Sequence, residues 1–159
     1  MLALPVLGWY AEGERGEDMI GLVACCKTKL AEPARAEDLY RSPLFRKAKA
    51  YCLAHYSRWF ILSAKFGVVD PGQVIAPYDC TLLDQDKPAR AEWGQLVYRQ
   101  LSALGLTEDT FVAHAGKAYI TPLADKVRIV APLAGLGIGQ QMAWYGQKDK
   151  AGRRTKTQA

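Results

Sequence analysis

The chain has 159 residues and a mass of 17.5 kDa; 50% of its residues are hydrophobic, 23% are charged, and the formal net charge is +5. This profile is typical of one globular domain and excludes a disordered chain, a collagen-like repeat and a two-domain enzyme. The longest apolar stretches, such as residues 129–136, are far shorter than the roughly 20 residues of a membrane helix, so the sequence predicts no membrane partner.

Taken in chain order, the first feature is an irregular N-terminal extension over residues 1–18, which is rich in glycine and acidic residues. A short apolar run over residues 20–24 then predicts a first strand buried on both faces of a sheet. Ser42 and Pro43 have the positions of an N-cap and a first helical residue, and apolar residues at helical spacing continue to His55. The sequence therefore predicts a helix between Ser42 and His55.

The remaining elements alternate in the same way. Apolar runs predict strands over residues 59–62, 110–113 and 127–130. Asp86 and Gly105 mark the two ends of a second helix, and shorter helices are expected over residues 118–125 and 139–145, the last of them ending at Gly146. This order predicts an α/β domain over residues 19–147: a three-layer α/β/α fold with a small four-stranded, mainly parallel sheet.

Residues 148–159 are expected to form a basic C-terminal tail, with five cations against Asp149. Such a tail attracts polyanions such as nucleic acid through counterion release, and it is equally typical of a solubilising end. The cysteines include the adjacent pair Cys25 and Cys26, which cannot form a comfortable disulfide. With no secretory leader pattern at the start, they predict a reduced, cytoplasmic protein. Cys52 and His55 are spaced like one pair of metal ligands, but the sequence has no second pair at such a spacing. We therefore expect no metal and no other cofactor.

Polar or glycine-rich clusters follow all four predicted strands, at residues 25–29, 63–67, 114–117 and 132–137. Because the carboxyl ends of parallel strands meet at one edge of a sheet, and open sheets bind ligands there, we expect the clusters to face one cleft. The candidate catalytic residues are Cys25, Lys29, Lys65 and Asp79.

Each catalytic candidate also has a structural interpretation. Cys25 is a nucleophile if Lys27 or Lys29 lowers its pKa, and otherwise a small core residue. Lys65 reaches either the cleft or the solvent. Asp79 is a base or a partner for positive charge, unless it caps residues 80–82 or pairs with a lysine.

The candidate substrate-binding residues supply stacking faces, polar groups or backbone amides for a phosphate. They are Cys26, Lys27, Tyr40, Ser42, Phe66, Tyr78, His114, Gly116, Gly135 and Gly137. The glycines from 135 to 139 do not match the dinucleotide-binding spacing, so they form either a structural turn or a phosphate-binding turn. His114 is either a hydrogen-bonded interior histidine or an acid-base group.

Five ordered motifs resemble those of an uncharacterised bacterial and phage family with a Cys-Ser-Lys-x-Lys opening (DUF6884-like). They cover residues 23–30, 39–45, 61–69, 77–82 and 132–139, and Cys26 stands where that family usually has Ser. The element from Cys25 to Lys29 is also similar to the Cys-Ser-x-x-Lys-Pro-Tyr element in the catalytic domain of archaeosine synthase, without the Pro-Tyr. The strand order resembles the uracil-DNA glycosylase-like superfamily, although its water-activating and histidine motifs are absent here.

These resemblances imply an enzyme that processes nucleic-acid bases, cleaving or exchanging the N-glycosidic bond of a modified base in DNA or RNA. Asp79 would stabilise positive charge on the sugar or activate water, and Lys29 or Lys65 would polarise the departing base or attack the sugar. Two alternatives stay open. One is a non-catalytic DNA-binding or stress-response module, as in the peroxide-stress YaaA family, which has a similar opening motif. The other is an enzyme that acts on free nucleosides.

Overall fold

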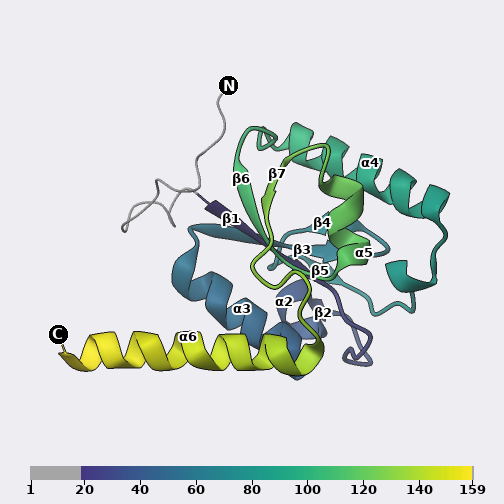
Figure 1. The fold of residues 1–159 in the computed structure, drawn as a ribbon. Helices are drawn as coiled ribbons and strands as arrows, with labels where there is room; N and C mark the ends of the chain where they lie inside the picture. The colour runs from purple at the N-terminus through teal and green to yellow at the C-terminus, as the bar shows by residue number, and fades with distance from the viewer. Residues whose placement is uncertain (1–18, 159) are drawn as a thin grey trace.

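The computed structural model describes residues 19–158, with side chains as far as residue 150, and the extension predicted for residues 1–18 lies outside the described residues. In this part of the chain, the central sheet has five strands in the order β4-β3-β1-β6-β7 (Figure 1). The four predicted strands are confirmed as β1 (Met19–Ala24), β3 (Arg58–Ser63), β6 (Thr110–His114) and β7 (Arg128–Val130). These four run parallel, so their carboxyl ends meet at one edge of the sheet.

The fifth strand corrects the prediction of a four-stranded sheet. β4 (Gly67–Val69) is antiparallel to β3 and forms an edge, and β2 (Ala34–Arg35) pairs with β5 (Val74–Ile75) in a separate two-stranded sheet. The reversal between β3 and β4 includes Gly67, whose φ of +78° favours glycine. On the outer side of β4, the Gln100 side chain accepts a hydrogen bond from the Val68 backbone N–H at 2.7 Å and donates one to the Phe66 carbonyl at 2.9 Å.

Helices lie on both faces of the sheet, where two hydrophobic clusters form. On one face, Leu22 and Phe60 pack with Trp93 of α4 (Lys87–Ala103), close to α5 (Lys117–Ile120) and the short 3-10 helix η3 (Thr121–Leu123). On the other face, Val23 packs with Phe45 of α3 (Pro43–His55) and with residues of α2 (Ala36–Leu39). Neighbouring residues of β1 thus point into different clusters, as expected for a strand buried on both faces.

The predicted helix starts are confirmed by side-chain caps. Ser42 accepts a hydrogen bond from the Phe45 backbone N–H at 3.0 Å, and Asp86 accepts one from the Ala89 N–H at 3.0 Å. The predicted end of the last helix at Gly146 is wrong, because α6 runs over Ile138–Gln158. An interior glycine disfavours a helix by only about 1 kcal/mol, and here the face that carries Tyr145 packs against α3. None of the helices between residues 19 and 158 is both long and apolar enough to cross a membrane.

Candidate active site

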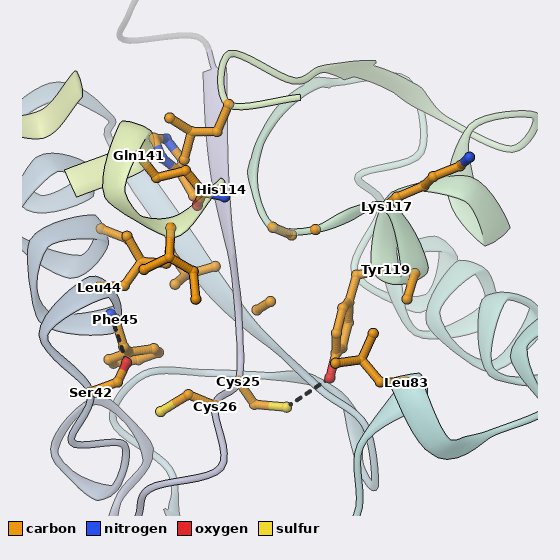
Figure 2. Close-up of a pocket in the computed structure, with 18 of the residues that line it drawn as sticks. Cys25, Cys26, Ser42, Leu44, Phe45, Leu83, His114, Lys117, Tyr119 and Gln141 are labelled. Atoms are coloured by element: carbon orange, nitrogen blue, oxygen red, sulfur yellow. Dashed lines mark hydrogen bonds between the residues drawn. The ribbon is translucent and has the colours of Figure 1, made fainter. Parts of the chain in front are cut away.

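A crevice opens at the carboxyl ends of β1 and β6. The chain leaves β1 towards α2 and α3 on one face of the sheet, and it leaves β6 towards α5 on the other face. Diverging connections of this kind create the ligand site of open parallel sheets. A cavity of about 400 Å³, which we call the apolar cavity, lies there (Figure 2). Its lining includes Val23, Cys25, Cys26, Ser42, Leu44, Phe45, Leu83, His114, Gly116, Tyr119, Leu133, Gln141 and Tyr145.

A second hollow, the charged cavity, adjoins the first and measures about 480 Å³. Four of its lining residues, Cys25, Cys26, Leu83 and Tyr119, also line the apolar cavity. Its other lining residues are more polar: Lys27, Lys29, Asp79, Cys80, Thr81 and Asp84. Because the two cavities share four lining residues, we call them together the cleft.

Cys25 lies where the two cavities meet. Its Sγ is 3.4 Å from the Tyr119 hydroxyl and accepts a hydrogen bond from the Ala64 backbone N–H, also at 3.4 Å. Figure 2 shows the Cys25 side chain pointing towards Tyr119, with Ser42 and Phe45 on the opposite wall. Burial, followed by the proximity of Cys25, raises the pKa of Tyr119 above its usual range, so this hydroxyl stays protonated at neutral pH and is available as a donor.

Lys29 is held at the charged cavity by aromatic rings. Its Nζ lies 4.4 Å from the centre of the Tyr78 ring and 5.7 Å from that of Tyr40, and it donates to the Lys27 carbonyl at 3.5 Å. Contacts of this kind between an ammonium group and a ring face are attractive. They keep the Lys29 cation beside the exposed side chains of Lys27 and Asp79.

Beneath Lys29 runs a chain of hydroxyl groups. Ser63 accepts hydrogen bonds from the backbone N–H groups of Lys65 and Phe66, at 3.1 and 2.9 Å, and donates to the Tyr78 hydroxyl at 2.8 Å. The hydroxyls of Tyr78 and Tyr40 are 2.6 Å apart. Burial raises the pKa of Tyr40 to about 12 and also raises that of Tyr78. The chain is therefore uncharged at neutral pH and fixes the rings that hold Lys29.

This arrangement corrects the expectation that Tyr40 and Tyr78 offer stacking faces. Tyr40 is 0% exposed, so no ligand reaches its ring. Lys29 lies over the ring of Tyr78, and Phe66 packs edge-on against it at 5.5 Å. Phe66 is itself half-buried and lines neither cavity. These three aromatic residues lie around Lys29 and the turn after β3, and none of them lines either cavity.

Two predicted groups lie outside the cleft. Lys65 is exposed, with its Nζ 5.3 Å from the Phe66 ring, and lines neither cavity. In the glycine-rich turn after β7, Gly135 has a φ of +81°, the Leu136 N–H donates to Leu133, and the Gly137 N–H donates to the Gln140 side chain at 2.9 Å. The structural interpretation of this turn is therefore favoured, because these two amides are already engaged.

His114 matches the interior alternative. It is 4% exposed, its Nδ1 lies 2.7 Å from the Tyr145 hydroxyl, and its Nε2 lies 3.0 Å from the Tyr56 hydroxyl. Burial, with a smaller effect of His55, lowers the pKa of His114 to about 4. It borders the apolar cavity, and its lowered pKa keeps the imidazole neutral near neutral pH.

The remaining candidates lie at the cleft: Cys25, Cys26, Lys27, Lys29, Ser42, Asp79 and Gly116. Two residues that both cavities share are not among those predicted from the sequence. Tyr119 lies in the helix predicted after the third strand, where an aromatic residue one turn from the 114–117 cluster is the signal that could have found it. Leu83 lies on the 3-10 helix η2 (Leu82–Asp84), and no pattern in the sequence points to it. Among residues 19–150, no group of three His, Cys, Asp or Glu side chains is arranged to hold a metal ion.

One of the comparisons with known proteins gives a family, and none of them gives an activity. The chain is 36% identical, over 67 residues, to the "Uncharacterized protein YfjM" of Bacillus subtilis (strain 168); the match covers 38% of this chain and 45% of that protein. The chain therefore spans less than half the length of this curated relative. No solved structure matches the chain. The DUF6884 family, a family of unknown function, matches residues 20–147. Since this match covers most of the sequence, the chain belongs to the DUF6884 family.

Proposed function

We propose that this protein is an enzyme that processes nucleic-acid bases by cleaving or exchanging the N-glycosidic bond of a modified base in DNA or RNA. The observation that carries the proposal is the cleft, in which an apolar and a charged cavity share Cys25, Cys26, Leu83 and Tyr119. A nucleotide has the same two parts, a flat base and a polar sugar phosphate. The size of the apolar cavity, about 400 Å³, is within the range of small-molecule sites.

In this proposal the base occupies the apolar cavity, between Phe45 of α3 and Tyr119 of α5. The sugar lies where the two cavities join, near Cys25, and the phosphate lies near Lys27 and Lys29. Two features support this orientation. The cations line only the charged side of the junction, apart from Lys117. The Asp79 carboxylate lines the same side, where a sugar would be.

The chemistry follows from the charge that develops when the bond breaks. The electron pair of the C1′–N bond leaves with the base nitrogen, and positive charge develops on the sugar. Asp79 would stabilise that charge and accept a proton from the water whose oxygen bonds to C1′. The Lys29 ammonium would donate a proton to the departing base, and the Tyr119 hydroxyl would donate a hydrogen bond to it. Hydrolysis then consumes one water and yields a free base and a sugar hydroxyl; in exchange, the nitrogen of a second base replaces the water.

The resemblances from the sequence support the same class of reaction. Cys25 and Lys29, which match the archaeosine synthase element, both line the charged cavity. We also propose that the domain is related to the uracil-DNA glycosylase-like superfamily, with three layers, because helices cover both faces of a parallel sheet. The free cysteines fit a cytoplasmic location.

The test is to incubate the full chain with single-stranded DNA and RNA oligonucleotides that carry natural or modified bases, and to detect released or exchanged base by mass spectrometry. We expect Asp79→Asn to lower turnover by about 100-fold or more, the usual range for loss of an acid-base group, with oligonucleotide affinity retained. Asp38→Asn, on α2 and outside the cleft, is the matched control. Absence of release and exchange on every substrate, while a known glycosylase works in the same buffer, would refute the enzyme proposal.

A second candidate is a non-catalytic nucleic-acid-binding module, as in the YaaA family. One observation favours it: Asp79 is exposed, and within the described residues no hydrogen bond or ion pair orients its carboxylate. A catalytic carboxylate is usually held in place by such contacts. The same assay separates the two candidates, since a module binds the oligonucleotides and releases no base from any of them.

A further inference from the structure

A third hollow, which we call the basic groove, opens next to the cleft between η2, α4 and α5. It measures about 750 Å³ and is lined by Lys87, Arg90, Lys117, Lys126 and Asp125, together with smaller residues. Four cations thus face one carboxylate, and the Asp125 carboxylate is already 3.6 Å from the Lys126 ammonium. The groove therefore carries a local excess of positive charge.

The basic groove adjoins the cleft. It shares Lys117 and Ala118 with the apolar cavity, and it shares Leu83 with both cavities. Figure 2 shows the Lys117 side chain pointing away from Cys25, so its ammonium lies at the outer side of the cleft. A chain-like anion that binds in the groove would therefore have one part next to the entrance of the apolar cavity.

Leu83, which all three hollows share, is held in an exposed position. Leu83 is 71% exposed, so its side chain is accessible to a ligand from the groove and from the cleft. The Leu83 N–H donates to the Thr81 hydroxyl at 3.2 Å, and Arg90 donates to the Leu82 and Leu83 carbonyls at 2.8 and 3.3 Å. The backbone of η2 thus fixes an apolar side chain at the boundary between the groove and the cleft.

We propose that the basic groove binds the sugar-phosphate backbone of a single-stranded polynucleotide, while one base of that strand passes Leu83 into the apolar cavity. The inference rests on the proposed function and adds that the strand is single and that its backbone lies in the basic groove. A row of phosphates explains why the cations extend beyond the cleft, since a nucleoside would not reach them. A single strand is favoured because a base in a duplex would first have to leave its partner, which costs free energy.

The experiment measures the affinity of the full chain for a fluorescent 12-nucleotide single strand, as RNA and as DNA, across a range of salt concentrations. The groove variant carries Lys87→Ala, Lys117→Ala and Lys126→Ala. The control variant removes three exposed cations elsewhere, Arg46, Lys47 and Arg99, and so has the same net charge. Thermal melting verifies that both variants fold. Arg90 is left intact because it holds η2.

Loss of three phosphate contacts should make the slope of log affinity against log salt less steep by about 2, which corresponds to about 100-fold weaker binding at 0.1 M salt. The slope of the control variant should differ from that of the wild type by less than about 0.7, the effect of one phosphate contact. Leu83→Ala should weaken binding by about tenfold with an unchanged slope, because an apolar contact releases no counterions. Preference for RNA or for DNA identifies the polymer, and either result supports the proposal.

Three results would overturn the inference: equal slopes for the groove variant and the wild type, an equal loss in the control variant, or binding of a duplex or of polyglutamate with the same dependence on the three lysines. The proposed function fails by a different measurement, the absence of base release by the wild type. Affinity is measured without turnover, so the two failures are distinguishable.

Discussion

His114 makes the stability of the fold depend on pH between about 6.5 and 4. Burial lowers the pKa of His114 from 6.5 to about 4 in the folded state, whereas an unfolded chain leaves it near 6.5. As the pH falls through this window, the unfolded state takes up a proton that the folded state does not. The free energy of unfolding is therefore highest above pH 6.5 and decreases on acidification until the folded pKa is reached.

The size of this effect follows from the two pKa values. A difference of one in pKa corresponds to about 1.4 kcal/mol, so the difference of about 2.5 gives roughly 3.5 kcal/mol in total, of which about 3 kcal/mol is lost by pH 4. Removing the imidazole by His114→Gln should remove this contribution, in addition to a pH-independent loss from the contacts with Tyr56 and Tyr145. The difference between wild type and variant isolates His114, because the carboxylates titrate in both.

The assay is urea unfolding at a series of pH values from 8 to 4. His55→Asn is the matched control, because His55 is the other histidine of the chain and is exposed. We expect the free energy of His55→Asn to fall nearly as much as that of the wild type, since His55 has only the smaller effect on the pKa of His114, and that of His114→Gln to fall less by up to about 3 kcal/mol. Parallel curves for wild type and His114→Gln would refute the reasoning. If that variant does not fold, an NMR titration of the wild type should still show one imidazole that remains neutral at pH 5.

Three further predictions concern a buried hydroxyl, close packing and a helical glycine. Ser63→Ala should lower the free energy of unfolding by about 1–3 kcal/mol in urea titrations, because two backbone N–H groups and the Tyr78 hydroxyl lose a fully buried partner, whereas the exposed Ser102→Ala should change it little. An equal effect of both variants would contradict this. Gly21→Ala should lower the free energy of unfolding by about 1–3 kcal/mol, since a Cβ there would lie 2.8 Å from Cys52 Sγ. Gly146 lies inside α6 with open space around it, so Gly146→Ala should raise the free energy of unfolding by up to about 1 kcal/mol. A higher melting temperature for Gly21→Ala than for the wild type would contradict the prediction for Gly21.

The sequence predicts those parts of the fold whose signals are local. The caps at Ser42 and Asp86 determine where α3 and α4 begin, and both lie beside the helices that they start. The four apolar runs predict the parallel strands for the same reason. β4 could not be predicted in this way, because its outer edge is paired with Gln100, more than thirty residues further along the chain.

The candidate site follows the same division. The parallel order of the strands brings Cys25, Lys29 and Gly116 to one edge of the sheet, and this could be predicted. The contact between Cys25 and Tyr119 joins residues 94 positions apart and depends on where α5 packs. The residue type of Tyr40 permits stacking on a ligand, but its burial is set by the backbone bridge to Lys29 and by packing against Phe45. Residue type alone does not determine exposure.

The Gln100 side chain has a consequence for how copies of this protein meet in solution. An edge strand with open N–H and carbonyl groups invites a strand from another molecule to continue the sheet, which is a common route to aggregation. Here one amide side chain occupies both the Val68 donor and the Phe66 acceptor, as a neighbouring strand would. A strand from another molecule would first have to displace Gln100, so this side chain protects the β4 edge against the addition of further strands.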